Sequence, residues 1–592
     1  MRNTIIAAIV SLTLISHAQQ CTVDWNDMHQ RIDGFGASCA FSGRTWLAST
    51  ADDFFSTNTG IGLSLLRNRI QPTGTASASE LGLMQMAKAR GAKVWSAPWS
   101  PPTIYKTTTS LNSGFFAASA ANYQGYANQL ASYVVQTKNS GVDVYAVSIQ
   151  NEPDATNLTY EACGWTAQEF HDFVPYLYNA LAASNVASTK IMLPEGQHWE
   201  SGTNLYTTAM NDPNVAAKVG ILANHNYDGP NPQTGSTATP VALPAYGKAL
   251  WQTEVMTTDA FDGSITNAMY WATRIHLFLT AAQVNSWQYW VLIAGSSSNS
   301  GLENIGDIPA KRMYVLGQYS RFVRPDYYRI GVNNPANTLI SAYKDPVTGN
   351  FAIVAVNTNA TTAVNQTFNL NNFTNSSSVT PWITSSNLSL AGQTPVAVTG
   401  SSFIYTLPAL SVVTFVGQAG PSNTAPTLAP VADQTINAGA NLMVTNTATD
   451  PDVPQQTFSF NLLTGPTNAI LTPLDATNAL FTWRPPVSQA GTTNQITVKV
   501  VDSGSPALSA TNRFNVIVNP LSPIILSSVG VSQGQVSFTV NGIQGPDYTV
   551  LTSTNLTGWQ ALWTTNSPVP PFTFIDTNCS DPVRFYRIQI GP

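Results

Sequence analysis

Short apolar runs alternate with longer segments of helical periodicity between residues 33 and 323. Each short run is apolar at consecutive positions, which is typical of parallel strands buried on both faces. The predicted strands are Ile32–Ser38, Gly62–Arg67, Lys93–Ala97, Asp143–Gln150, Lys190–Pro194, Gly220–Asn226, Ala249–Thr253 and Asn285–Trp290. The predicted helices are Glu80–Arg90, Ala117–Lys138, Thr166–Ala183, Thr266–Ala282 and Pro309–Phe322. This alternation predicts a (β/α)8 barrel, assigned with the segment before it to residues 19–323.

The pattern changes to short strands separated by turns from about residue 324 to 418. The predicted strands are Thr338–Tyr343, Phe351–Asn357, Thr367–Leu370, Val379–Thr384, Ser402–Leu407 and Ser411–Val416. We interpret residues 324–418 as a β-sandwich on the side of the barrel, completed by Thr22–Trp25 from the N-terminal segment. An independent sandwich domain is the alternative.

The remaining residues predict two further all-β modules in a multidomain chain. Residues 419–426 have the composition of a linker. Residues 427–520 resemble cadherin-like or immunoglobulin-like modules through Asp450-Pro451-Asp452 and Val501-Asp502-Ser503-Gly504, although these motifs are short. Residues 521–592 predict a small β module, in which we expect Trp559 and Trp563 to form the core rather than to bind sugar.

The first 18 residues have the features of a secretory signal peptide. Arg2 gives a positive start, Ile5–Ile15 is mostly apolar but too short to span a bilayer, and Ser16-His17-Ala18 fits a cleavage site. No later segment has 18 uninterrupted apolar residues, so the sequence predicts a secreted protein without a membrane span.

The composition narrows the class of partner. Charged residues make up only 9% of the chain and the formal net charge is −6, which argues against a nucleic-acid partner. Hydrophobic residues make up 43%, enough for a large core. Such a surface, rich in uncharged polar residues, is common in secreted proteins that act on neutral polymers. The four cysteines have no metal-binding spacing, and their pairing stays open.

Two carboxylates directly follow predicted strands of the barrel. Asn151 and Glu152 come after the fourth strand, and Glu254 comes after the seventh. Active residues of such barrels lie at the C-terminal ends of the strands, so both acids are expected at one barrel mouth. Glycoside hydrolysis requires a facing pair of carboxylates. A single acid after a strand is usually a solvated loop residue, but two such acids in a chain with few charges favour a catalytic pair.

Several motifs in this part of the chain carry a family resemblance. They are Asp33-Gly34-Phe35-Gly36, Ser96 to Pro102 (SAPWSPP), Ile149 to Asp154 (IQNEPD), Tyr160 to Thr166 (YEACGWT) and Gln318 to Pro325 (QYSRFVRP). Together they resemble glycoside hydrolase family 30, and within it the bacterial xylanase and glucuronoxylanase branch, over about residues 21–418. The resemblance implies a barrel with a side β-sandwich, retaining hydrolysis of a polysaccharide, and no cofactor.

The resemblance also implies roles for individual residues. Glu152 matches the general acid/base and Glu254 the nucleophile. Five further positions match residues that bind the sugar or support the nucleophile: Asn151, Arg67, Trp99, Tyr227 and Trp290. Each tryptophan alone could instead be a core residue. His225 is interpreted either as a residue that orients the site or as a buried core histidine.

One departure from the branch concerns the side groups of the substrate. The glucuronoxylanase branch uses a basic residue after the eighth strand to bind glucuronate, but Val291–Ala310 contains no Lys or Arg. This absence argues against strict dependence on glucuronate, and we expect an endo-β-1,4-xylanase with relaxed or different recognition of side groups.

Alternatives within the family are a β-1,6-glucanase, a β-1,6-galactanase or a glucosylceramidase-like glycosidase. A non-catalytic carbohydrate-binding surface protein is the alternative from another class, and it predicts loss of Glu152, Glu254 or Arg67, all of which are present. Neither a metal-ligand cluster, a GxSxG motif nor a Gly-rich phosphate loop is found in the sequence.

Overall fold

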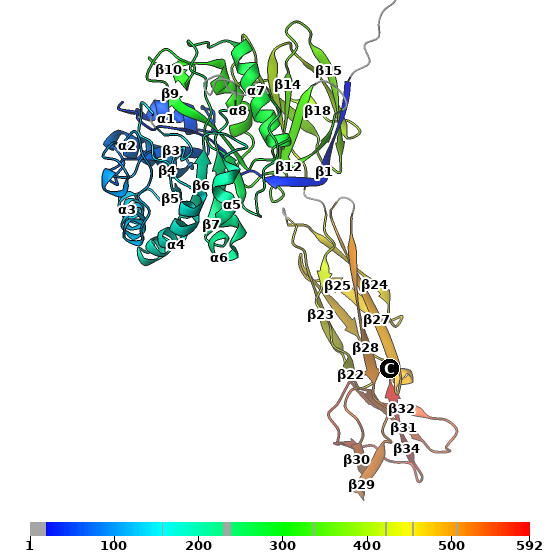
Figure 1. Ribbon diagram of the computed structural model, residues 1–592. Coiled ribbons are helices and arrows are strands. Elements are labelled where there is room, and N and C mark those ends of the chain that lie inside the picture. Colours follow the sequence, from blue (N-terminus) through cyan, green and yellow to red (C-terminus); the bar gives the residue numbers. More distant parts are fainter. Residues whose placement is uncertain are drawn as a thin grey trace, which may run out of the picture. The chain divides into compact units, whose positions relative to one another are not determined.

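The computed structural model describes residues 19–156, 158–228, 238–334, 338–420, 423–452, 455–504 and 507–592. The chain divides into two compact units, residues 1–420 and residues 421–592 (Figure 1). The predicted signal peptide, residues 1–18, lies outside the described residues. Within the described residues, no helix has both the length and the apolar character that a bilayer span requires.

Eight parallel strands of the first unit close into a barrel, which confirms the predicted fold class. They are β2 (Gly34–Ser38), β3 (Leu65–Ile70), β4 (Lys93–Pro98), β5 (Val144–Ser148), β6 (Lys190–Gly196), β7 (Val219–Asn224), β8 (Ala249–Gln252) and β9 (Ser286–Ile293). Each strand pairs with the next one along the chain, and the pairing of β9 with β2 closes the ring. Nearly all strand residues are buried, as their continuous apolar pattern predicts.

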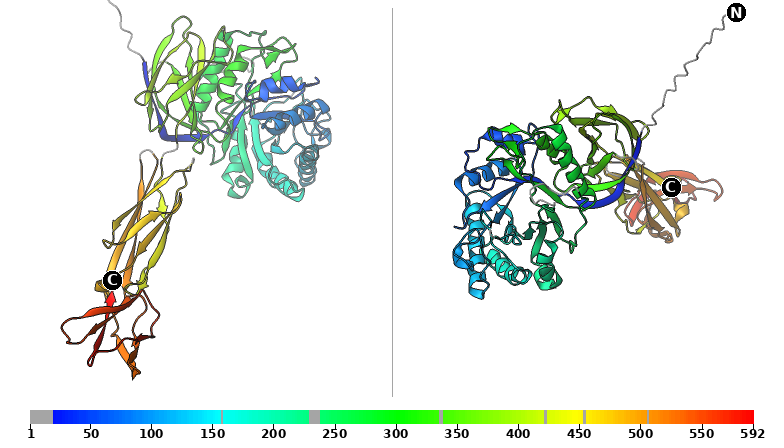
Figure 2. Two further views of the ribbon diagram at one scale, coloured as in Figure 1. Left: turned by 180° about the vertical axis from the view of Figure 1, so that it is seen from behind. Right: turned by 45° about the horizontal axis from the view of Figure 1, so that its top comes forward.

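Helices surround the barrel (Figure 2). Five coincide with predicted helices: α2 (Ala78–Ala89), α3 (Ala120–Asn139), α4 (Ala167–Ala183), α7 (Ile265–Thr280) and α8 (Lys311–Ser320). Three short helices were not predicted: α1 (Ala48–Phe55), α5 (Thr203–Asn211) and α6 (Pro213–Ala216). Helix α4 begins with a capping box, in which Thr166 accepts a bond from the Glu169 backbone and the Glu169 carboxylate accepts one from the Thr166 backbone.

A ten-stranded sheet lies beside the barrel within the first unit (Figure 1). Its strands are β1 (Gln19–Arg31), β12 (Tyr328–Asn333), β13 (Leu339–Lys344), β14 (Asn350–Asn357), β15 (Val364–Asn371), β16 (Ser378–Thr384), β17 (Ala391–Gly392), β18 (Val396–Ala397), β19 (Ser402–Leu407) and β20 (Ser411–Gln418). Strand β1 pairs with β12 on one side and with β15 on the other. Its alternating residues Cys21, Val23 and Trp25 are buried, so they fix one face of this strand to the core.

The described residues of the second unit form four small β-sheets and one short 3-10 helix, Val487–Gln489. Two four-stranded sheets contain β21 (Thr427–Leu428), β22 (Gln434–Ile436), β23 (Leu442–Thr449), β24 (Phe458–Thr464), β25 (Ile470–Pro473), β26 (Asn478–Trp483), β27 (Thr493–Asp502) and β28 (Ser509–Val518). Two three-stranded sheets contain β29 (Ile525–Ser532), β30 (Gln535–Asn541), β31 (Asp547–Ser553), β32 (Gln560–Thr565), β33 (Phe572–Asp576) and β34 (Phe585–Gly591).

The predicted core role of two tryptophans in the second unit is wrong. Trp563 is 38% exposed, and the Arg587 guanidinium covers the half-buried ring of Trp559. The buried cluster of this module is instead formed by Val536, Phe538, Val540, Tyr548, Val550 and Phe574. Trp563 sits on strand β32, most of whose residues are exposed, so its ring covers the edge of that cluster.

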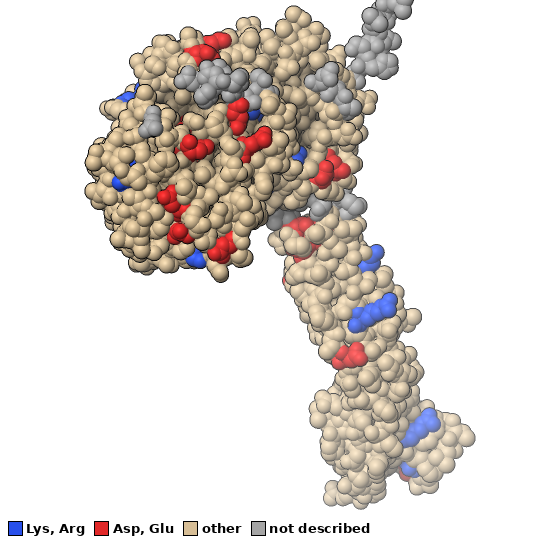
Figure 3. Space-filling view, in the orientation of Figure 1, with Lys and Arg blue, Asp and Glu red and all other residues tan. Residues whose placement is uncertain are grey.

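Charged side chains are sparse on the face of the molecule in view, where uncharged residues predominate (Figure 3). All four cysteines are free thiols, and Cys21, Cys39 and Cys163 are buried. The stability of the described part of the chain therefore rests on its apolar cores rather than on disulfide bonds or dense surface ion pairs.

Candidate active site

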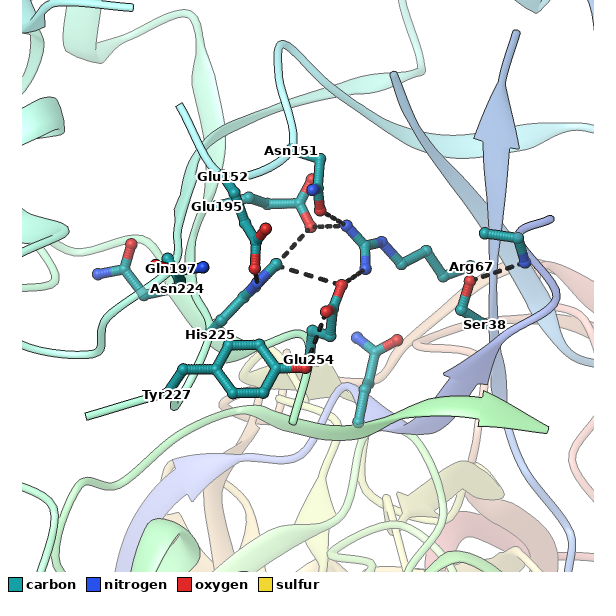
Figure 4. A network of polar contacts seen from close by, with 12 residues as sticks. Ser38, Arg67, Asn151, Glu152, Glu195, Gln197, Asn224, His225, Tyr227 and Glu254 are labelled. Atoms are coloured by element: carbon teal, nitrogen blue, oxygen red, sulfur yellow. Dashed lines mark hydrogen bonds and ion pairs between the residues drawn. The ribbon is translucent and has the colours of Figure 1, made fainter. Parts of the chain in front are cut away.

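The C-terminal ends of the barrel strands bring the predicted residues together around one cavity. This cavity has a volume of about 530 Å³. Its lining includes Trp99, Glu152, Tyr227, Glu254 and Trp290, all of which the sequence analysis singled out. Arg67 contacts both Glu254 and Asn151 (Figure 4). All seven predicted site residues therefore belong to one constellation.

Arg67, in β3, is the cation at the centre of the constellation. It is 1% exposed. Its guanidinium donates through Nη1 to Oε2 of Glu254 and through Nη2 to Oδ1 of Asn151. The same Nη2 lies 2.9 Å from Oε1 of Glu195. A planar guanidinium can hold several oxygens in fixed directions, so Arg67 sets the positions of three side chains from three different strand ends.

Glu152 and Glu254 face each other across the cavity. Each provides an oxygen, and these two atoms lie within 4.8 Å of one another. The Glu152 backbone donates to the carbonyl oxygen of Glu195 over 3.0 Å, which ties the end of β5 to the end of β6. Tyr227 donates from its hydroxyl to Oε1 of Glu254 over 2.9 Å, so both oxygens of that carboxylate have a donor.

The structure adds two residues that the sequence analysis did not select. Tyr160 donates to Oε2 of Glu152 over 2.7 Å, and Glu195 lies buried between Arg67 and His225. Glu195 could have been found by the same rule that found Glu152 and Glu254, because it directly follows the apolar run of the fifth strand. No comparable signal marks Tyr160, which reaches the cavity from a loop.

His225 orients the site rather than filling the core. It follows β7, and both of its ring nitrogens face carboxylates. Nδ1 lies 3.2 Å from Oε1 of Glu152, and Nε2 lies 3.5 Å from Glu195 and 3.8 Å from Glu254. Burial lowers the pKa of His225, but Glu254, Glu152 and Glu195 outweigh burial and raise it to about 10. The three carboxylates thus favour the charged form of the imidazole.

The pKa values of Glu152 and Glu254 shift in opposite directions. Burial raises the pKa of Glu254, and the negative charge of Glu152 raises it further. Burial also acts to raise the pKa of Glu152, but the bonds from His225 and Tyr160 and the charges of His225 and Arg67 outweigh burial and lower it. His225 and Arg67 favour the ionised form of Glu254 as well, yet burial dominates there and its pKa stays above the usual range.

Aromatic rings form the walls of the cavity. The guanidinium carbon of Arg67 lies 4.5 Å from the ring centre of Trp99 and 5.7 Å from that of Trp290. Trp99 packs against Phe41 and Trp290, with ring centres 5.2 Å and 5.7 Å apart. These apolar faces with few polar groups suit the faces of sugar rings.

The polar cluster does not fit a resident metal ion. Glu152, His225 and Glu254 each offer a ligand atom within 4.8 Å of the others. Arg67 already contacts Glu254, however, and both nitrogens of His225 are directed at carboxylates. The protein's own cations thus supply the positive charge that a metal ion would bring.

A second cavity adjoins the first, and Phe41 and Trp290 line both. It has a volume of about 410 Å³. Arg44, from the loop after β2, lines it and pairs with Asp307, from the loop after β9. Nη1 lies 2.7 Å from Oδ1, and Nη2 lies 2.9 Å from Oδ2. Although the loop after the eighth barrel strand has no basic residue of its own, the fold brings Arg44 to it with its guanidinium already occupied.

Comparisons with known proteins identify the family of the barrel. Residues 29–264 match the Glycosyl hydrolase family 30 TIM-barrel domain. The chain is 31% identical over 441 residues to glucuronoxylanase XynC of Bacillus subtilis strain 168, covering 70% of this chain and 98% of that protein. Two solved structures are each 31% identical and cover 68% of this chain and all of theirs. They are the family 30 subfamily 8 xylanase Xyn30A of Clostridium acetobutylicum, with a TM-score of 0.59, and a family 30 endoxylanase of Clostridium papyrosolvens C71, with a TM-score of 0.57.

Proposed function

The chain belongs to glycoside hydrolase family 30, and from this premise we propose that it is a retaining endo-β-1,4-xylanase. The observation that carries the retaining mechanism is the separation of the two carboxylates. Oxygens of Glu152 and Glu254 lie within 4.8 Å. Retaining enzymes place their carboxyl groups about 5–5.5 Å apart, whereas inverting enzymes need about 6.5–9.5 Å to admit a water molecule.

In the first step, Glu254 attacks the anomeric carbon and Glu152 protonates the departing glycosidic oxygen. Arg67 and Tyr227 hold the Glu254 carboxylate by donating to its two oxygens, which favours its ionised form. Asn151, fixed by Arg67, is placed to bond the sugar hydroxyl beside the reacting carbon. The product of this step is a glycosyl ester on Glu254.

In the second step, Glu152 acts as a base and takes a proton from water, which attacks the same carbon and releases Glu254. His225 contacts one oxygen of Glu152 and Tyr160 donates to the other, so both stabilise the carboxylate that forms there in the first step. The two displacements restore the original configuration at the anomeric carbon.

The named relatives support the proposal of xylan as the substrate. The cavity beside the active site favours uncharged sugar side groups over acidic ones. Arg44 lies at that cavity, but Asp307 occupies its guanidinium through two contacts. A glucuronate carboxylate would have to displace Asp307, which makes recognition of an acidic side group unfavourable.

A reducing-sugar assay on linear xylan, glucuronoxylan, β-1,6-glucan and β-1,6-galactan tests the substrate. Comparable rates on the two xylans, and none on the β-1,6-linked polymers, are expected. Release only from a β-1,6-linked polymer would keep the mechanism and overturn the substrate. No release from any of them would favour a carbohydrate-binding role without catalysis.

Substitution of Asp307 with asparagine is expected to raise the rate on glucuronoxylan relative to linear xylan. The change removes the carboxylate that occupies Arg44 and leaves a guanidinium free to pair with glucuronate, an interaction worth about 1.5–3 kcal/mol, or roughly tenfold or more in kcat/KM. The double variant Asp307→Asn, Arg44→Met is the control, since it should return the ratio to its starting value. An unchanged ratio in Asp307→Asn would refute this account of specificity.

We also propose that the protein is secreted and that the second unit positions it on polysaccharide or at a cell surface. The signal-peptide pattern of residues 1–18 supports export. The low charge content supports contact with neutral polymers. Detection of the protein in the culture medium of its host would test the first proposal, and pull-down of residues 421–592 with insoluble xylan would test the second.

A further inference from the structure

Glu195 is a third carboxylate in the active-site cluster, and the proposed mechanism gives it no step. It is fully buried near the end of β6. Its carbonyl oxygen accepts the backbone bond of Glu152, and the carbonyl oxygen of Gly196 accepts that of His225 over 2.8 Å. Its φ of 57° lies in the left-handed region, which a non-glycine residue occupies only when its surroundings impose it. The fold thus fixes Glu195 between the acid/base and the histidine.

The contacts of the Glu195 carboxylate are ionic. Oε1 lies 2.9 Å from Nη2 of Arg67 and 3.5 Å from Nε2 of His225. Among the described residues, neither oxygen has a partner that meets the geometry of a hydrogen bond. A buried carboxylate without other partners is costly unless cations compensate it, so Glu195 depends on Arg67 and favours the charged form of His225.

The surroundings of His225 are almost entirely acidic. Glu152 faces Nδ1, while Glu195 and Glu254 face Nε2. The other groups nearby are the ring of Tyr227, with its centre 6.0 Å away, the guanidinium of Arg67 and the carboxylate of Asp154. A neutral imidazole has one nitrogen that only accepts. If that nitrogen is Nε2, it faces the carboxylates of Glu195 and Glu254 without a proton between them, and if it is Nδ1, it can accept the proton that Glu152 has to deliver to the leaving group.

The charges of the cluster balance in both steps of the proposed mechanism when His225 is protonated. Before attack, Arg67 and His225 oppose Glu195 and Glu254, while Glu152 holds its proton. In the glycosyl-enzyme, Glu254 is a neutral ester and Glu152 has become the carboxylate, so two cations again oppose two anions. Glu195 is the anion that stays constant through both states.

We propose that Glu195 is a positioning residue that keeps His225 a charged imidazolium throughout the double displacement. This inference rests on the proposed function. A charged His225 can only donate, so it stabilises the carboxylate that forms on Glu152 and cannot take the proton that Glu152 must deliver to the leaving group. A neutral His225 would do neither reliably, because its free nitrogen would compete for that proton.

The direct test is the charge of His225, read by NMR of the protein labelled with ¹⁵N-histidine, without substrate. The chain has six histidines, and the spectrum of His225→Gln identifies the signal. In the wild type, His225 should stay charged between about pH 5 and 8, where an ordinary histidine loses its proton. In Glu195→Gln, loss of one nearby anion should lower its pKa by about 1–3, so that deprotonation begins within this range.

Kinetics then show whether the charge matters for catalysis. In Glu195→Gln, kcat on the polysaccharide should fall as pH rises, and this fall should follow the NMR titration of His225. Glu200→Gln is the matched control, since it removes an exposed carboxylate from the following loop and should leave both curves unchanged.

Three outcomes would overturn the inference. The first is an ordinary pKa for His225 in the wild type, a result that does not depend on the Glu195 variant. The second is an unchanged His225 titration in Glu195→Gln. The third is a dependence of kcat on pH in Glu195→Gln that has the same shape as in the wild type and is lower by the same factor at every pH. A structural role of Glu195 alone would give that result. Inactivity of the wild type on every glycan would refute the proposed function and with it the catalytic role of the His225 charge. The NMR result does not need turnover, so it still decides separately whether Glu195 keeps His225 charged.

Discussion

Replacement of Glu254 with alanine is expected to reduce hydrolysis of xylan by a factor on the order of 10⁴ to 10⁶, because it removes the attacking carboxylate. The loss should appear in kcat measured on the polysaccharide. Circular dichroism should show an unchanged fold, since the short side chain leaves the Arg67 guanidinium with Glu195 and Asn151 as partners.

Added azide distinguishes a nucleophile from a residue that only binds substrate. In Glu254→Ala, azide can take the place of the missing carboxylate and attack an activated aryl glycoside, giving a glycosyl azide of inverted configuration. In the matched variant Glu152→Ala, azide should instead attack the glycosyl-enzyme and give a product of retained configuration. Exchange of these two outcomes would reverse the assigned roles, and rescue in neither variant would contradict double displacement.

Replacement of Arg67 with methionine is expected to lower the free energy of unfolding by about 3–5 kcal/mol at neutral pH, together with a severe loss of activity. The reason is that removal of one partner leaves buried carboxylates without compensation. Arg67 is 1% exposed and contacts both Glu195 and Glu254. Chemical denaturation measures the change. The control Lys88→Met removes an exposed pair with Asp143 and should cost about 0–1 kcal/mol.

The pH dependence of this loss has a definite sign. Burial already raises the pKa of Glu254 in the folded protein, and loss of Arg67 raises it further. A carboxyl group whose folded pKa lies above its unfolded value of about 4.3 destabilises the protein at pH values above that unfolded value. The difference in stability between Arg67→Met and the wild type should therefore be small below about pH 4 and largest near pH 7. A difference that is the same at both pH values would contradict this account.

The barrel could be predicted from the sequence because the same hydrophobic pattern recurs along the chain. Eight continuous apolar runs mark strands buried on both faces, and the acid that follows a run marks the barrel mouth. Glu152 and Glu254 were found in this way, and the structure places their oxygens within 4.8 Å. Glu195 follows its strand in the same way, but this signal does not distinguish a catalytic acid from a carboxylate that only supports the site.

The remaining features depend on contacts made by side chains in irregular loops. Tyr160 reaches Glu152 from an irregular loop, and Arg44 meets Asp307 across 263 residues of sequence. No local pattern encodes such partners. Short helices such as α1 and α5 were missed for a different reason, since segments of only two or three turns give little periodicity to detect.

The position of strand β1 governs the order in which the first unit can assemble. In β1, Thr22 pairs with Asn333 and Cys21 pairs with Phe368, so a strand at the start of this unit lies between two strands near its end. Closing so long a loop costs entropy that only later contacts repay. During synthesis the native partners of β1 become available only after all of the barrel strands have been made, because β12 and β15 follow the barrel in sequence. The side sheet therefore cannot be completed before the barrel has been synthesised, and its completion links the start of the unit to its end.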